Sequence, residues 1–202
     1  MRFFRPFFFY KWVFPGALFR IRARGKSLCL TFDDGPDPLS TPLISAILEK
    51  NGIKAVFFCN GQKAEANPDL VKNLKSGGHL IGNHGYRHLD GWRTETDQYL
   101  QNALLADHST SDSLFRPPFG RIKFSQFRKI SRKYQVVFWD LMPYDFDNDL
   151  DAGKCLHMLR KRIRPGSVIV LHDTPESKAS LILDDFIAYS VNKGYRFELP
   201  EE

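Results

Sequence analysis

Residues 27–58, SLCLTFDDGPDPLSTPLISAILEKNGIKAVFF, contain the pattern that decides the fold. An apolar run at 27–32 is followed by a helical pattern that starts at residues 40–42 (Ser-Thr-Pro) and ends at Gly52, and a second apolar run fills 53–58. Proline favours the first turn of a helix, and glycine marks its end. This order of strand, helix and strand predicts two parallel strands joined by a crossover helix.

The same alternation continues to the C-terminus. Further strands are expected at residues 79–82, 114–115, 136–139, 167–171 and 195–199, and further helices at 67–76, 94–107, 122–132, 151–163 and 181–192. About seven such repeats predict a single α/β domain, either an open doubly wound sheet or a barrel. A barrel of this length would be trimmed, because a full eight-fold one needs about 250 residues. Thr94 and Asp97 have the spacing of a capping box and predict a helix start.

The composition is that of a globular domain. A chain of 202 residues, 43% hydrophobic and 26% charged, is large enough for one core, and these values exclude a disordered or fibrous protein. The longest uncharged runs span eleven residues, fewer than the roughly 18 of a membrane-spanning helix. Cys29, Cys59 and Cys155 lack the paired spacing of a disulfide framework, so a reducing compartment is expected.

The net charge of +6 is concentrated in an N-terminal arm, residues 1–26. The first 32 residues hold seven Lys or Arg and no acid, and nine aromatic residues lie between Phe3 and Phe19. Basic residues interrupt the apolar run, so no convincing signal peptide is predicted. Packing over one end of the domain is the favoured interpretation; peripheral contact with an anionic membrane is the alternative, and nucleic acid is not expected as a partner. The protein is accordingly expected in the cytoplasm or peripherally at a membrane.

Residues that could carry chemistry lie where the predicted strands end. Parallel strands bring these ends to one edge of a sheet or barrel, where α/β proteins place their sites. The residues are Asp33 and Asp34, His84 and His88, Arg116, Asp140 and Asp145, and His172 with Asp173.

Two imidazoles four residues apart meet on one face of a helical turn, and one carboxylate completes a set that suits Zn²⁺, Fe²⁺, Co²⁺ or Ni²⁺. Structural alternatives remain open at this point: a turn at Asp-Gly-Pro, a chance histidine pair, and a core histidine at 172. His79, His108 and His157 have no acidic or strand-end neighbour and are interpreted as structural or surface residues.

Five motifs in this order resemble the polysaccharide deacetylase family, also known as the NodB-homology domain or carbohydrate esterase family four. They are TFDDGP (31–36), HGYRH (84–88), RPPFG (116–120), WDLMPYDF (139–146) and LHD (171–173), and the resemblance covers about residues 27–197. It implies a distorted (β/α)7 TIM-like barrel as a single catalytic domain, 27–202, behind the arm. It also implies a metal-dependent hydrolase that removes acetyl from N-acetylated amino sugars in poly- or oligosaccharides and releases acetate.

The resemblance implies a metal site and two groups that move protons. Asp34, His84 and His88 correspond to the ligands of one divalent ion, with Zn²⁺ favoured and Co²⁺, Ni²⁺ or Mn²⁺ as alternatives. Asp33 corresponds to the general base that activates water, and His172 to the general acid for the leaving amine.

The remaining motif residues are implied to support this chemistry. Arg116 corresponds to the residue that orients the base, and Asp145 to the carboxylate that tunes His172. The backbone N–H of Phe119 would help to hold the oxyanion, and Phe146 and Leu171 would form the pocket for the acetyl methyl group.

Three residues depart from the family pattern, and other functions stay open. Gly85 stands where members have a Ser or Thr that supports the histidine loop, which could weaken metal binding. Met142 replaces an Asp, and Phe146 replaces the usual Trp. The alternatives are a deacylase acting on a non-sugar amide, a non-catalytic glycan-binding homologue, and a glycosidase that uses the carboxylates of Asp33 and Asp145.

Overall fold

The strands form one parallel sheet that curls into an incomplete barrel. The computed structural model describes residues 4–6, 9–22, 25–110 and 113–200. The strands are β1 (Ser27–Asp33), β2 (Val56–Cys59), β3 (Leu80–Asn83), β4 (Leu114–Phe115), β5 (Gln135–Val136), β6 (Val168–His172) and β7 (Arg196–Phe197). Their order is β5-β4-β3-β2-β1-β6, with β7 beside the start of β1, and every pair is parallel. The predicted α/β single domain of distorted (β/α)7 type is confirmed.

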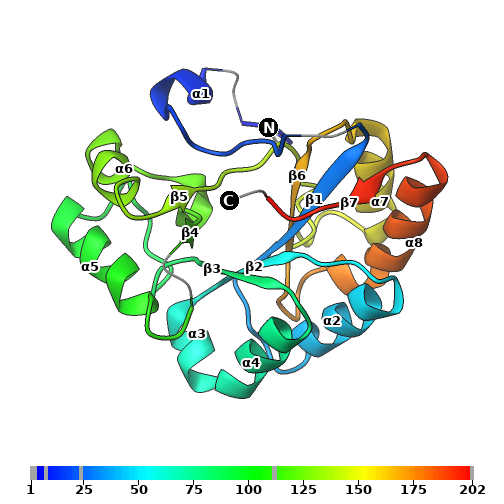
Figure 1. The fold of residues 1–202 in the computed structure, drawn as a ribbon, viewed down its shortest axis with the longest axis horizontal. Coiled ribbons are helices and arrows are strands. Elements are labelled where there is room, and N and C mark those ends of the chain that lie inside the picture. The colour runs from blue at the N-terminus through cyan, green and yellow to red at the C-terminus, as the bar shows by residue number, and fades with distance from the viewer. Residues whose placement is uncertain (1–3, 7–8, 23–24, 111–112, 201–202) are drawn as a thin grey trace.

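The helices surround the strands as an outer ring (Figure 1). They are α1 (Tyr10–Val13), α2 (Ser40–Lys50), α3 (Gly61–Ala66), α4 (Pro68–Ser76), α5 (Thr96–Ala106), α6 (Phe124–Ile130), α7 (Ala152–Arg162) and α8 (Ala179–Asn192). Ile44 and Leu48, one helical turn apart on α2, are buried against strand residues such as Leu30. Burial of each such side chain stabilises the fold by about 1.5–3 kcal/mol.

The structure differs locally from the predicted elements. The capping box at Thr94 is wrong: α5 begins at Thr96, and the Thr94 hydroxyl instead donates to the Asp90 carbonyl at 2.7 Å. The helix α3 has no counterpart among the predicted elements. It starts after Asn60, whose side-chain oxygen accepts a hydrogen bond from the Lys63 N–H. The strand β5 ends at Val136, earlier than predicted.

Part of the N-terminal arm lies between β5 and β6. The Leu18 carbonyl accepts from the Phe138 N–H at 2.8 Å, and the Ile21 N–H donates to the Gly166 carbonyl at 3.0 Å. The ring of Phe19 stacks on Phe138 with centroids 4.9 Å apart. In Figure 1 the helix α1 accordingly lies in the ring between α6 and α7. The described part of the arm is therefore packed against the domain.

The structure also bears on membrane-spanning helices and on the cysteines. None of the helices in the described ranges is both long enough and apolar enough to cross a membrane. The three cysteines are buried and unpaired, as their spacing predicted.

Candidate active site

A cavity of about 720 Å³ lies at the C-terminal ends of β1, β3, β4, β5 and β6. Its lining includes the residues that the sequence predicted at the ends of β1, β3 and β6: Asp33, Asp34, His84, His88 and His172. The strands are short and parallel, so residues far apart in the chain reach the same edge of the barrel. This is where the candidate chemistry is concentrated.

Asp34, His84 and His88 form a group that could hold a metal ion. Asp34 Oδ1 lies 3.4 Å from His84 Nε2 and 3.0 Å from His88 Nε2, and the two Nε2 atoms are 3.3 Å apart. Ligand atoms at about 2.0–2.1 Å from a tetrahedral zinc ion lie about 3.3 Å from one another, so the spacing fits. The Arg116 carbonyl lies 2.8 Å from His84 Nδ1, a contact that leaves Nε2 for a metal.

Both carboxylates of the Asp33-Asp34 pair face the cavity because of the backbone at Asp34. Asp33 is the last residue of β1, and Asp34 has a φ of +75°, a left-handed conformation that non-glycine residues seldom adopt. The turn brings Asp34 back toward the histidines, where simple strand alternation would have pointed it away. Burial alone would raise the pKa of the Asp34 carboxyl, but the hydrogen bonds of His84 and His88 and the charges of His84 and His172 hold that pKa well below its usual range.

The two histidines meet on a loop, not on the helical turn that their spacing predicted. Gly85 has a φ of +75°, and a Cβ there would come within 2.7 Å of Asn102 Nδ2. Asn102, on α5, donates from this Nδ2 to the Arg87 carbonyl and accepts from the Arg87 N–H, both at 2.8 Å. The Asn102 side chain therefore supports the loop in this chain, where glycine replaces the family's Ser or Thr.

A fully buried arginine holds Asp33. Arg116 donates from one terminal nitrogen to Asp33 Oδ1 at 2.6 Å and to Thr31 Oγ1 at 2.7 Å. Its other terminal nitrogen donates to the Phe138 carbonyl at 3.0 Å, and its guanidinium lies 4.1 Å above the Phe58 ring. The free oxygen of Asp33, Oδ2, lies 4.0 Å from His84 Nε2. One carboxylate oxygen is thus fixed, and the other is next to the histidine–aspartate group.

A second carboxylate holds His172. Asp145 Oδ1 lies 3.0 Å from His172 Nδ1, and Asp145 Oδ2 accepts from the His172 N–H at 2.8 Å and from Ser177 Oγ at 2.6 Å. Burial alone would lower the pKa of His172, but the charge and hydrogen bond of Asp145 raise it to about 9. Asp145 itself is completely buried. Because it cannot reach a substrate, the two-carboxylate glycosidase is not supported.

The sequence predicts that Phe146 and Leu171 form the apolar pocket, but only Phe146 lines the cavity. Phe119 and Phe146 line the cavity, with the Phe119 ring 4.3 Å from that of His88 and the Phe146 ring 4.6 Å from that of His172. Leu171 does not line the cavity: it is fully buried in the core cluster shared with α2 and α8. Successive strand residues point to opposite faces, so Val170, two before His172, lines the cavity instead.

Several residues at the site escaped the sequence analysis. Thr31 could have been found, since it precedes Asp33 by two residues and therefore shares its face of β1. Asn102 and Ser177 lie outside the five motifs, and no local pattern marks them. The same is true of Trp92, which lines the cavity.

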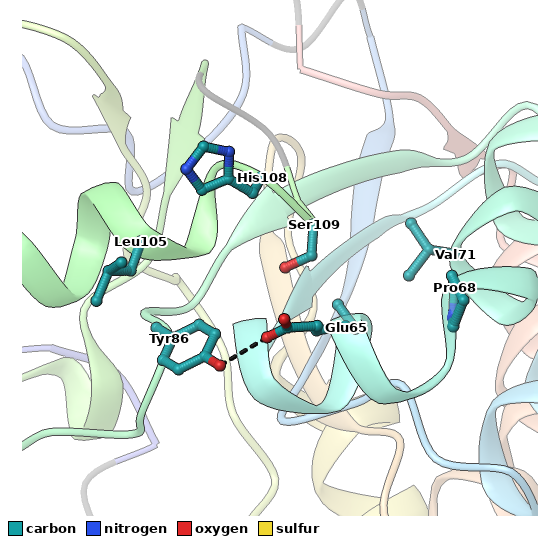
Figure 2. Close-up of a pocket in the computed structure, with 8 residues that line it drawn as sticks. Glu65, Pro68, Val71, Tyr86, Leu105, His108 and Ser109 are labelled. Carbon is teal, nitrogen blue, oxygen red and sulfur yellow. Dashed lines mark hydrogen bonds between the residues drawn. The ribbon is translucent and has the colours of Figure 1, made fainter.

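A second pocket of about 500 Å³ lies between α3, α4 and α5. Figure 2 shows Tyr86, from the histidine loop, donating to Glu65 Oε2 at 2.6 Å, with Leu105 and His108 nearby. His108 is exposed here, as predicted for a surface residue. His79 is buried and accepts from the Ala55 N–H at 3.2 Å, as expected of a structural histidine. The predicted metal and proton-transfer groups all lie at the first cavity.

The chain is similar to known proteins in sequence and in fold. The family model for polysaccharide deacetylase matches residues 20–139. A peptidoglycan-N-acetylglucosamine deacetylase of Bacillus cereus is 32% identical over 180 residues, covering 84% of this chain and 65% of that protein. The peptidoglycan-N-acetylmuramic acid deacetylase PdaA of Bacillus subtilis is 30% identical over 194 residues, covering 90% and 73%. The chain therefore spans just under two thirds of the first relative and more of the second.

A solved structure extends the likeness to the fold. The crystal structure of a peptidoglycan N-acetylglucosamine deacetylase in complex with 4-naphthalen-1-yl-N-oxidanyl-benzamide has a TM-score of 0.87 and 28% identity, covering 96% of this chain and 94% of that one. The geometry defines a curled α/β barrel with a group that could hold a metal ion, Asp34, His84 and His88, at the C-terminal edge of its strands. The chain belongs to the polysaccharide deacetylase family, whose named relatives are hydrolases acting on amide bonds of sugars.

Proposed function

We propose that the protein is a metal-dependent N-deacetylase of N-acetylated amino sugars in poly- or oligosaccharides. The observation that carries this proposal is the convergence of three units on one cavity: the Asp34–His84–His88 group, the Asp33–Arg116 pair and the His172–Asp145 pair. The names of the relatives, which are peptidoglycan deacetylases, favour a sugar amide over a non-sugar amide.

Asp34, His84 and His88 are proposed to hold Zn²⁺, for which two imidazoles and one carboxylate are suitable ligands. When bound, this ion would polarise the acetamide carbonyl and favour deprotonation of water. Co²⁺, Ni²⁺ and Mn²⁺ are the alternatives.

The Asp33–Arg116 pair and the His172–Asp145 pair each carry out one of the two proton transfers. Asp33 accepts the proton of the attacking water at Oδ2, because Arg116 holds its Oδ1. His172 uses its Nε2 to donate a proton to the leaving nitrogen, because Nδ1 is held by Asp145. Water oxygen bonds to the acetyl carbon, the C–N bond breaks, and acetate and a free amino sugar leave.

The cavity also offers groups for the acetyl moiety. The backbone N–H of Phe119 is assigned to the developing oxyanion, in the manner of other acyl-transfer sites. Phe146 and Val170 are assigned to the acetyl methyl group, because both line the cavity close to His172.

Acetate release from a panel of acetylated glycans, alongside acetylated peptides and small amides, tests the proposal. We expect release from N-acetylglucosamine oligomers, its loss after dialysis against a chelator, and its recovery with Zn²⁺ or Co²⁺. Full activity after exhaustive chelation would contradict the metal assignment. Glycan binding without acetate release at any metal would indicate a non-catalytic homologue.

A further inference from the structure

The N-terminal arm lines the same cavity as the proposed catalytic residues. Arg5, Pro6 and Tyr10 form part of the cavity wall that also contains Met142 and Tyr144. The family model matches from residue 20 onward, so the three arm residues lie outside it.

The start of this wall is fixed by backbone and ring contacts. The Phe4 carbonyl accepts from the Met142 N–H at 3.0 Å, and the Phe4 ring packs edge-on against Tyr144 at 5.6 Å. The Arg162 guanidinium lies 4.9 Å from the centre of the Phe4 ring. The residue before Arg5 is therefore held against the segment that contains two other members of the wall.

Arg5 is held by charge. Its Nε lies 3.6 Å from Asp140 Oδ1, and its terminal nitrogen donates to the Arg162 carbonyl. The side chain still keeps 29% of its surface exposed. A guanidinium has five N–H donors, so these contacts leave donors for a ligand in the cavity.

The two sides of α1 differ in their surroundings. Tyr10 packs against Phe14 at 5.7 Å and Phe138 at 6.2 Å and lines the cavity. Trp12, two residues later, is 82% exposed and is not among the lining residues. The helix thus presents one aromatic ring to the cavity and another to solvent.

The segments that follow β3 and β4 supply a second aromatic wall. Trp92 and Phe119, 53% and 57% exposed, both line the cavity. The Arg121 guanidinium lies 5.2 Å from the Trp92 ring and 5.7 Å from the Phe119 ring, and it is paired with Asp90 at 2.7 Å. The cavity therefore extends beyond the Asp34–His84–His88 group between surfaces of aromatic rings and arginine.

We propose that Arg5, Pro6 and Tyr10 bind a sugar unit remote from the one that is deacetylated, beyond its nearest neighbour, so that the arm makes the site selective for longer oligomers over a disaccharide. Apolar C–H faces of a sugar pack on an aromatic ring, and its hydroxyls accept hydrogen bonds from a guanidinium. Contacts with a remote sugar unit lower the activation barrier for hydrolysis when they orient the reacting unit in the site. The inference rests on the proposed function.

Matched leucine substitutions on α1 test this role. Tyr10→Leu keeps an apolar side chain against Phe14 and Phe138 but removes the ring, and Trp12→Leu makes the same change on the exposed side. Wild type and both variants are loaded with Zn²⁺, checked for equal melting temperature, and assayed for acetate release and for calorimetric binding with N-acetylglucosamine di- and pentasaccharides. Arg5→Gln serves as a second variant in case Tyr10→Leu is poorly folded.

We expect Tyr10→Leu to lower kcat/KM and affinity for the pentasaccharide by about three- to tenfold, and by less for the disaccharide. Trp12→Leu should match wild type on both. Equal losses on both substrates, or none, would overturn the inference. If wild type binds both oligosaccharides but releases no acetate, the proposed function fails, and the binding ratio of pentasaccharide to disaccharide still decides the role of the arm.

Discussion

The side chain of Asn102 and the backbone of Arg87 form two hydrogen bonds in opposite directions, each 2.8 Å long. They join α5 to the loop between His84 and His88. Because a Cβ at position 85 would approach Asn102 Nδ2 to 2.7 Å, glycine and asparagine fit this loop together. The glycine-containing loop is thus supported by a side chain from another element.

Replacing Asn102 with Ala should weaken metal binding. The loop would lose both hydrogen bonds, and partners of this kind are worth about 10–100-fold in metal affinity. Titration calorimetry of the metal-free protein with Zn²⁺ measures the effect, with the exposed neighbour Gln101→Ala as the control. An unchanged Zn²⁺ affinity in Asn102→Ala would show that the loop keeps its shape without this side chain.

Asp33→Asn should separate proton transfer from metal binding. The amide can still contact Arg116, but it cannot take a proton from water, and a general base contributes about 10²–10⁴-fold. We expect acetate release to fall by that factor while Zn²⁺ affinity stays close to wild type. Asp97→Asn, at a carboxylate whose side chain is 83% exposed, is the matched control. Loss of Zn²⁺ binding in Asp33→Asn would instead place Asp33 among the ligands.

Asp145→Asn should move the basic limb of the pH–rate profile to lower pH. Burial opposes protonation of His172, and the Asp145 carboxylate raises its pKa to about 9; without that charge the acid loses its proton earlier. Profiles of kcat/KM for wild type, Asp145→Asn and the exposed control Asp149→Asn measure the shift. Coincident basic limbs in all three would mean that another group donates the proton.

The His172–Asp145 pair also makes the stability of the metal-free protein depend on pH. The pKa of His172 is above its usual value in the folded state, at about 9. Its contribution to the free energy of unfolding is therefore complete below about pH 6.5 and is lost as the pH rises through 9. Urea unfolding across this range should show the decline in wild type and a smaller one in Asp145→Asn.

Phe14→Ala should destabilise the domain. Phe14 is 6% exposed and stacks on Phe138 at 5.3 Å and against Phe127 at 5.0 Å. Truncation of a buried Phe costs about 3–5 kcal/mol, which lowers the melting temperature of a chain of this size by roughly 10 °C. Trp12→Ala, on the exposed side, should leave the melting temperature unchanged. Salt-sensitive binding to anionic vesicles with no thermal effect of Phe14→Ala would favour the membrane interpretation of the arm.

The order of elements and the position of the site could be predicted from the sequence, because both depend on local patterns. Apolar runs and helix signals fix the alternation of strands and helices. Once the strands are parallel, Asp33, His84, Arg116 and His172 must come to one edge. The alternation of side chains along a strand also predicts that Val170, not Leu171, lines the cavity, because residues two apart, such as Val170 and His172, share a face of the sheet.

Contacts between distant segments could not be predicted. The bonds of Asn102 to Arg87 and of Ser177 to Asp145 depend on how α5 and the segment before α8 lie against distant loops, which neither partner's local sequence encodes alone. The conformation of Asp34, with its φ of +75°, is likewise imposed by the surrounding turn. The contribution of the arm to the cavity could not be predicted either. The composition of the arm predicts that it packs against the domain, but not which residues it contacts.

The placement of the arm between β5 and β6 has a consequence for the order of folding. Leu18 and Ile21 bond to residues more than a hundred positions further along the chain, and closing such long loops is slow and entropically costly. During synthesis the arm leaves the ribosome long before its partners near Gly166. The wall formed by Arg5, Pro6 and Tyr10 then lacks its neighbours until the segment that leads into the strand carrying His172 is available. The nascent chain acquires a complete cavity only after the segment that contains Gly166 and His172 has been made.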